Sequence, residues 1–185
     1  MFGWNEYYKC PNAESGEIMY NAILYPTDGS EGANAALDHV QDLASTYDSE
    51  VHVLYAIDTT HEGFGMVGER SGDDGPGMSG EHHELDSPGM VGGHFDPDKQ
   101  HESFKEYGEQ VVAETEQQFE GIETVTAVES GDPYETILGY ADEHGIDLIV
   151  MGTHGRTGAD RYLIGSVTEK VVRTSEVPVF TVRGE

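Results

Sequence analysis

The chain has 185 residues, enough for one domain, and a single cysteine, Cys10, so no intrachain disulfide can form and a cytoplasmic location is expected. Its 36 aspartates and glutamates outnumber nine lysines and arginines, which gives a net charge of −27. Such a surface disfavours nucleic acid and acidic membranes as partners, and no segment is apolar for long enough to cross a bilayer. The acidity also indicates a halophilic protein, because concentrated salt screens the repulsion between carboxylates.

The N-terminal part predicts two strands and one helix after an irregular start. Residues 1–18 lack the features of a secretory signal and are interpreted as an extension. The predicted elements that follow are a strand at Met19–Pro26, a turn at Thr27–Ser30, a helix from Ser30 to about Tyr47 and a strand at Glu50–Asp58. Ser30 suits a helix N-cap, because its hydroxyl can accept from a backbone N–H of the first turn.

A segment at about residues 61–101 lacks apolar periodicity and is rich in Gly, His, Asp and Glu. We interpret it as an insert that is either disordered or a functional loop. Its histidines, His61, His82, His83, His94 and His101, leave transition-metal binding as an alternative, although their spacings match no defined site. The glycine patterns that begin at Gly63 and Gly75 do not open a helix, so they do not predict a dinucleotide site.

Helices and strands alternate again in the C-terminal part. The predicted elements are a helix at Phe104–Phe119, a strand at Ile122–Val128, a helix from the N-cap Asp132 to His144, a strand at Ile146–Met151, a helix at Ser166–Thr174 and a strand at Val177–Val182. Pro133 at the first helical position and Glu135 at the third strengthen the helix start at Asp132. This alternation predicts an α/β fold with an open parallel sheet, helices on both faces and a ligand at the carboxyl ends of the strands.

A glycine-rich segment joins the strand that ends at Met151 to the helix that begins at Ser166. Ser166 and Glu169 match a capping box, and the N–H groups and positive dipole end of that helix suit a phosphate. Arg156 and Arg161, two of the nine cations, lie in the same segment. Neutralising a polyphosphate is one reason for them, and pairing with neighbouring acids such as Asp160 is the other.

Gly152, Gly155, Gly165 and Ser166 form the pattern Gly-x2-Gly-x9-Gly-Ser, which resembles the ATP-binding signature of the universal stress protein family. Residues 23–30 resemble that family's first strand and turn, and residues 166–172 and 177–179 resemble its last helix and strand. The resemblance covers 19–184 apart from the insert, so we treat that range as one domain. It implies an adenine nucleotide alpha hydrolase-like fold, an open five-stranded parallel sheet in the order 3-2-1-4-5 with helices on both faces.

The resemblance also implies the ligand and its contacts. ATP is the expected cofactor, and Mg2+ is a further candidate that would accompany it. The implied binding residues are Pro26, Thr27 and Ala56 around adenine, Asp28 at the ribose or adenine side, Met151 and Gly152 against adenosine, and Gly155, Arg156, Gly165, Ser166 and Val167 around the phosphates, with His154 and Thr168 completing the set. An ordinary turn cap is the alternative for Asp28, and loop packing is the alternative for His154. A homodimer through the last strand, Val177–Val182, is also implied and agrees with an apolar strand at a sheet edge.

Three functions remain open at this stage. The first is an ATP-binding regulatory or stress-response module. The second is a slow ATPase or autophosphorylating enzyme, although no nucleophile–base pair stands out and no catalytic residue is assigned. The third is a metal-binding or protein-interaction module that acts through the insert.

Overall fold

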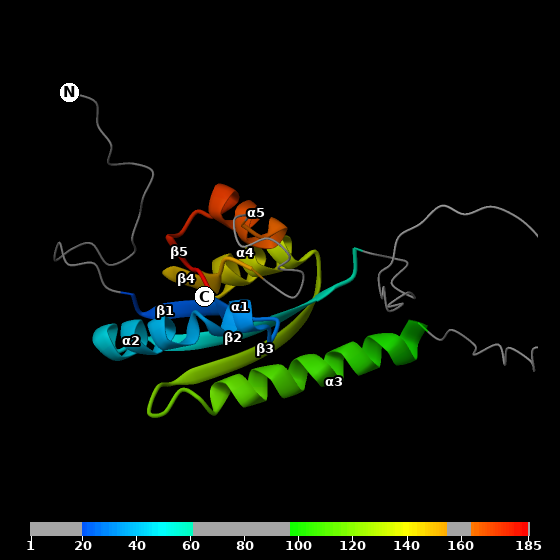
Figure 1. Ribbon diagram of the computed structural model, residues 1–185, viewed down its shortest axis with the longest axis horizontal. Helices are drawn as coiled ribbons and strands as arrows, with labels where there is room; N and C mark the ends of the chain where they lie inside the picture. The colour runs from blue at the N-terminus through cyan, green and yellow to red at the C-terminus, as the bar shows by residue number, and fades with distance from the viewer. Residues whose placement is uncertain (1–19, 61–96, 155–163, 185) are drawn as a thin grey trace, which may run out of the picture.

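The structure is a computed structural model that describes residues 20–60, 97–154 and 164–184 (Figure 1). Its elements in chain order are β1 (Ala22–Pro26), α1 (Glu31–Asn34), α2 (Leu37–Tyr47), β2 (Glu50–Asp58), α3 (Pro97–Glu116), β3 (Thr124–Gly131), α4 (Pro133–Glu143), β4 (Leu148–Gly152), α5 (Ser166–Thr174) and β5 (Val179–Val182). The alternation of strands and helices that the sequence predicts is therefore present.

The strands form one sheet in the order β3-β2-β1-β4-β5, with every neighbouring pair parallel. The chain builds β2 and β3 on one side of β1, then crosses over and builds β4 and β5 on the other side. The predicted 3-2-1-4-5 sheet is confirmed. In sheets of this kind the crevice at the switch point, here between the carboxyl ends of β1 and β4, is where ligands bind.

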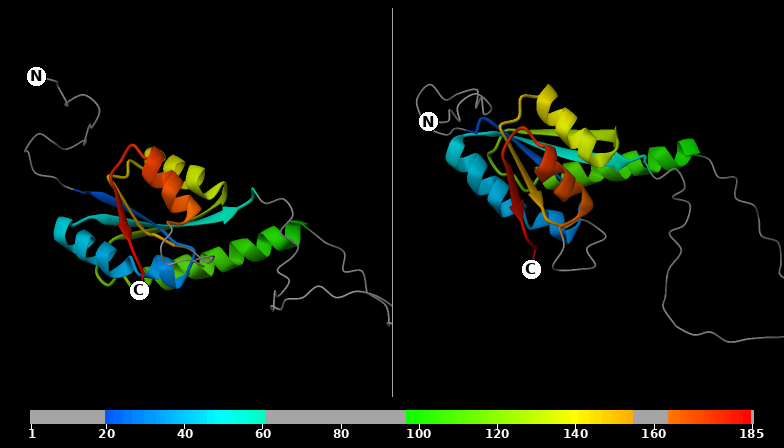
Figure 2. Two further views of the ribbon diagram at one scale, coloured as in Figure 1. Left: turned by 45° about the horizontal axis from the view of Figure 1, so that its top comes forward. Right: turned by 90° about the horizontal axis from the view of Figure 1, so that it is seen from above.

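Helices cover both faces of the sheet, as expected. Figure 2 shows α4 and α5 on one face and α1, α2 and α3 on the other. Successive side chains of β1 alternate between the two cores: Ile23 and Tyr25 pack toward the face of α2 and α3, and Leu24 packs toward α4 and α5. All five residues of β4 are buried, as expected for a strand inside a parallel sheet.

The predicted helix from Ser30 to Tyr47 is wrong in one respect, because the chain forms two helices there. The N–H of Ala36 donates to the oxygen of Ala33, three residues back, and the buried Tyr25 hydroxyl donates to the same oxygen at 2.9 Å. This tight turn separates α1 from α2. The apolar spacing continues across the break, so the sequence carried no signal for it.

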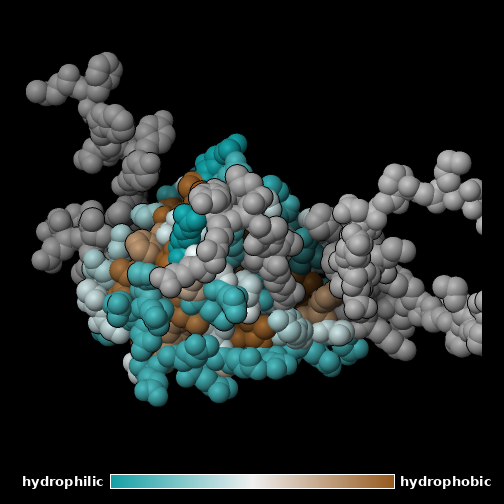
Figure 3. All heavy atoms as spheres, viewed as in Figure 1, coloured by the Kyte–Doolittle hydropathy of each residue, from teal (hydrophilic) through white to brown (hydrophobic). Residues whose placement is uncertain are grey.

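Two further boundaries differ from the predictions. Helix α3 begins at Pro97, inside the range predicted for the insert, and strand β3 runs from Thr124 to Gly131. Hydrophilic side chains cover the outer side of α3 (Figure 3), so its first turns carry little apolar periodicity. Of the helices in the described ranges, none is apolar for long enough to span a membrane.

Candidate functional site

The turn after β1 is held by three of its own side chains. Thr27 is 6% exposed, and its N–H extends the sheet by donating to the oxygen of Leu54 at 2.9 Å. Its hydroxyl accepts from the N–H of Gly29 at 3.2 Å, and Asp28 Oδ1 accepts from the N–H of Ser30 at 3.0 Å. Ser30 accepts from Ala33 at 3.2 Å, which confirms it as the N-cap of α1. Asp28 therefore has the turn-capping role, and a carboxylate that caps through one oxygen can still meet a ligand.

Tyr25 lies beneath this turn and is fully buried. Burial raises the pKa of its hydroxyl to about 12, the negative charge of Asp28 adds to the rise, and a hydrogen bond with Thr27 opposes it. The hydroxyl consequently stays protonated over the physiological pH range and keeps donating to Ala33 in α1. The position of α1 thus depends on a neutral buried tyrosine.

Two glycines bring α1 against the carboxyl end of β4. A Cβ placed on Gly152 would lie 2.1 Å from the oxygen of Gly32, and a Cβ placed on Gly32 would lie 2.3 Å from the oxygen of His154. Only glycine permits backbones this close. The sequence analysis explained Gly152 by a ligand and overlooked Gly32. Because of this contact, residues 152–154 lie beside α1, the helix that directly follows the turn at Thr27–Ser30.

The end of β4 is also bonded to the start of α5. The N–H of Gly165 donates to the oxygen of Thr153 at 2.7 Å, and the buried Thr168 hydroxyl donates to the oxygen of Gly152 at 3.0 Å. Next to this connection, His154 Nδ1 lies 2.8 Å from the Thr153 hydroxyl. These bonds place the first turn of α5 at the switch point, which is where the sequence analysis placed the phosphates.

The predicted capping box of Ser166 and Glu169 is wrong. Gly165 is the N-cap of α5, no side chain of the described residues caps this helix, and Ser166 occupies the first helical position. Glu169 instead forms an ion pair with Arg173, one turn further along the helix. The pattern Ser-x-x-Glu is present in the sequence, but the non-helical N-cap residue is Gly165, directly before Ser166. Because its N-cap is a glycine, the start of α5 has no side-chain acceptor at the cap position within the part of the chain that the structure describes, which favours an external anion.

The structure places the predicted binding residues around this edge with different exposures. Pro26, Thr27, Met151, Gly152 and Thr168 are buried; Asp28, Ala56, His154, Gly165 and Val167 are half-buried; Ser166 is exposed. Gly155 and Arg156 lie outside the described residues. The Met151 side chain packs in the core beneath α4 and α5, so only its backbone reaches the carboxyl edge.

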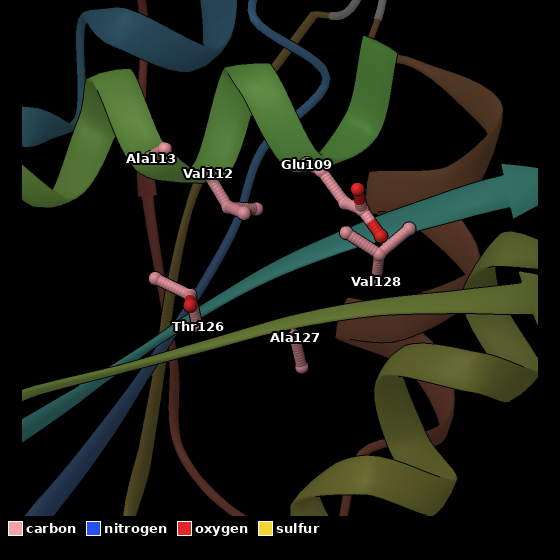
Figure 4. A pocket seen from close by; sticks show the side chains of 6 residues that line it. All are labelled: Glu109, Val112, Ala113, Thr126, Ala127 and Val128. Atoms are coloured by element: carbon pink, nitrogen blue, oxygen red, sulfur yellow. The ribbon is translucent and has the colours of Figure 1, made fainter. Parts of the chain in front are cut away.

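A shallow groove of about 250 Å³ lies elsewhere, between α3 and β3. Figure 4 shows Glu109 and Val112 of α3 facing Thr126 and Val128 of β3, with Ala127 turned away. These strand residues lie in the middle of β3 and not at its carboxyl end. The groove gathers one ionisable side chain among small apolar ones, so we do not take it as the functional site.

The sequence profile of the universal stress protein family matches residues 19–183. The chain belongs to this family. Universal stress protein MJ0577 of Methanocaldococcus jannaschii is 34% identical over 166 residues, which cover 90% of this chain and 96% of that one. The solved structure of MJ0577 superposes with a TM-score of 0.67, at 28% identity over 91% of this universal stress protein and 99% of that chain.

Two more distant structures show the same adenine nucleotide alpha hydrolase-like fold. One is a universal stress protein in complex with cAMP, which has a TM-score of 0.58 and 17% identity and covers 91% of this chain and 100% of that one. The other is a universal stress protein family protein of Arabidopsis thaliana with AMP bound, which has a TM-score of 0.52 and 15% identity and covers 89% and 92%.

Proposed function

We propose that this universal stress protein binds ATP at the carboxyl edge of its sheet and acts as a regulatory module in a stress response. One observation carries the proposal: the start of α5, whose N-cap is Gly165, is bonded to the end of β4 at the switch point, beside α1 and the turn at Thr27–Ser30. A helix start of this kind offers backbone N–H groups and a positive dipole end to a phosphate.

The proposed contacts divide the ligand into two parts. The proposed phosphate contacts are Gly165, Ser166, Val167 and Thr168, together with Gly155 and Arg156. The proposed nucleoside contacts are Pro26, Thr27, Ala56, Asp28, Met151 and Gly152. His154 is proposed to lie between the phosphate contacts and the nucleoside contacts. The complexes of fold relatives with cAMP and AMP agree with an adenine nucleotide as the ligand class.

A metal ion enters this proposal only together with the nucleotide. Within the described ranges, no group of three His, Cys, Asp or Glu side chains is arranged to hold a metal ion. Mg2+ is commonly bound through phosphate oxygens, one or two carboxylates and several waters, so the triphosphate would supply ligands that the described residues do not. Mg2+ and the arginines Arg156 and Arg161 would offset the charge that ATP adds to a chain of net charge −27.

We extend the proposal to a cytoplasmic homodimer that pairs through β5. This strand lies at an edge of the sheet, where Phe180 is 42% exposed, and Val172 of the neighbouring α5 is 49% exposed. An open edge with apolar side chains is suited to pairing with a second copy related by two-fold symmetry.

Ser166→Glu tests the phosphate site without removing any contact of the fold. Ser166 is exposed at the first position of α5, where a carboxylate stabilises a helix slightly but would repel a phosphate. Calorimetry in molar KCl should show ATP binding to the wild type and at least a tenfold loss in the variant, since a like charge at contact distance costs more than about 1.4 kcal/mol. Adenosine should bind both proteins equally.

Ser45→Glu, on the exposed side of α2, is the matched control because it adds the same charge away from the site. It should bind ATP like the wild type. Absence of ATP binding by folded wild-type protein would refute the proposed function. Equal ATP affinities for Ser166→Glu and Ser45→Glu would show that the phosphates lie elsewhere.

A further inference from the structure

The middle of α3 carries two exposed aromatic side chains. Between residues 101 and 116 of this helix, the buried residues are Gly108, Val111, Val112 and Thr115. All four lie in its C-terminal half, which packs on β2 and β3. Phe104 is 36% exposed and Tyr107 is 44% exposed. Figures 1 and 2 show that α3 runs past the carboxyl end of β2, so its first turns lie beyond the sheet, whereas Tyr107 still lies against Tyr55 of β2.

Tyr107 is held against the turn that carries Asp28. A Cβ placed on Gly29 would lie 3.5 Å from the Tyr107 hydroxyl oxygen and 3.2 Å from a methyl carbon of Val111. Gly29 has a φ of +77°, so the turn has the left-handed geometry that glycine favours and leaves this space to α3. The Tyr107 hydroxyl thus lies one residue away from the predicted ribose ligand.

A second contact fixes the ring itself. The rings of Tyr107 and the buried Tyr55 meet edge to face, with centroids 6.0 Å apart and planes at 69°. Gly108 allows this approach, because a Cβ there would lie 2.7 Å from a ring carbon of Tyr55. Tyr55 precedes Ala56, the predicted adenine wall on β2, so Tyr107 spans the space between the end of β2 and the turn after β1.

We propose that Tyr107 is a positioning residue for the nucleoside part of the bound nucleotide. The proposal rests on the nucleotide site proposed above. The ring forms an apolar wall for the base, and the hydroxyl hydrogen-bonds the nucleoside beside Asp28. A tyrosine suits this position because it offers a broad apolar surface and one polar tip, both on a rigid side chain. Backbone N–H groups at α5 hold any phosphate, whereas the Tyr107 wall makes binding depend on the base.

The test compares three variants and three ligands by calorimetry in molar KCl. The variants are Tyr107→Ala, Tyr107→Phe and the control Phe104→Ala, which removes a similarly exposed aromatic ring one turn earlier on the same helix face. The ligands are ATP, adenosine and inorganic triphosphate. Tyr107→Ala should weaken ATP and adenosine by the same factor of about tenfold, which is typical of losing a base–aromatic contact. Tyr107→Phe should weaken both about threefold through loss of the hydroxyl.

Inorganic triphosphate separates a positioning role from a structural one. Its affinity should not change in any variant, because a side chain at the nucleoside does not touch phosphates. If Tyr107→Phe lost affinity for ATP, adenosine and inorganic triphosphate alike, the inference would be overturned. It would also be overturned if the Tyr107 variants lost affinity for ATP but not for adenosine. Wild-type affinities in Tyr107→Ala would overturn it as well and leave the nucleotide site standing. Absence of ATP and adenosine binding by the wild type would refute both.

Discussion

Replacing Gly152 by alanine tests whether the contact between α1 and β4 organises the site. The added Cβ would lie 2.1 Å from the oxygen of Gly32, 2.7 Å from its carbonyl carbon and 3.0 Å from the Cα of Ala33, and all three are backbone atoms. Ordinary contacts begin at 3.4 Å, so the two backbones must separate by more than 1 Å. Helix α1 cannot yield freely, because the Tyr25 hydroxyl and the Ser30 cap hold it.

We expect Gly152→Ala to lower the free energy of unfolding by about 3 kcal/mol, the upper end of the usual penalty for overpacking, since no flexible side chain can move aside. With a urea m-value of roughly 2 kcal/mol/M, the unfolding midpoint should fall by about 1.5 M. Circular dichroism during urea unfolding in molar KCl measures this shift, because urea leaves the ionic strength unchanged. ATP affinity should fall too, since the turn at Thr27–Ser30 leads directly into α1.

Gly139→Ala is the matched control for this experiment. Gly139 lies in α4 with open space around the position of a Cβ, so alanine should stabilise the helix by about 0.5–1 kcal/mol. The two glycine-to-alanine changes should therefore shift the midpoint in opposite directions. A Gly152→Ala midpoint equal to or above that of the wild type would show that α1 does not press on β4, and our account of this edge would be wrong.

Three other outcomes follow from the described contacts. Between pH 10 and 12 the free energy of unfolding should fall by about 2 kcal/mol more in the wild type than in Tyr25→Phe, because the raised pKa of Tyr25 makes its contribution complete below pH 10 and lost as the pH passes about 12; an equal dependence of unfolding free energy on pH in both proteins, measured with urea, would contradict this. Thr168→Val should lower the free energy of unfolding by about 1–2 kcal/mol, because it removes the buried hydrogen bond to Gly152. Thr174→Val removes an exposed hydrogen bond to Lys170 and should be nearly neutral. Similar urea unfolding midpoints for both variants would show that the Thr168 bond does not hold α5 against β4. Phe180→Glu should give a monomer by light scattering in molar KCl if β5 forms the dimer, and an unchanged mass relative to a wild-type dimer would exclude Phe180 from the interface.

The sequence predicted the strands and the layers well, because each depends on a local pattern. Apolar runs such as residues 148–152 identify buried parallel strands, and the Asp132 side chain caps α4 as expected, accepting from the N–H of Tyr134. Gly145 follows that helix with a left-handed φ of 63°, a position where helices commonly end in glycine. The failures occurred where a pattern allows two geometries. The apolar spacing of one helix fits α1 and α2 equally well, and Ser-x-x-Glu at residue 166 is a capping box only if the helix begins one residue later.

The motifs in the sequence indicate the residue types of the candidate site, but not the packing that brings its elements together. The turn at Thr27–Ser30 and the residues from Gly152 onward stand out through their motif, and the structure brings both to the switch point. The contact of Gly32 with Gly152 joins residues far apart in the sequence, and an isolated glycine in a predicted helix gives only a weak hint of it. Tyr107 has the spacing of a core residue, and only the structure shows that it is 44% exposed between Tyr55 and the turn at Gly29.

The arrangement suggests why such an acidic protein can hold an anionic ligand. Most side chains predicted to bind the nucleotide are already engaged in the fold: Thr27 and Thr168 bond backbone groups, and Met151 fills the core. The proposed phosphate contacts therefore come mainly from backbone N–H groups, which act at short range and keep their strength in molar salt, where attraction between distant charges is screened. It follows that changes which move the backbone, as at Gly152 or Gly32, should harm binding more than removal of any one polar side chain. In the proposed site, discrimination between nucleosides should depend on the side chains at the turn after β1 and on α3, Asp28 and Tyr107 above all.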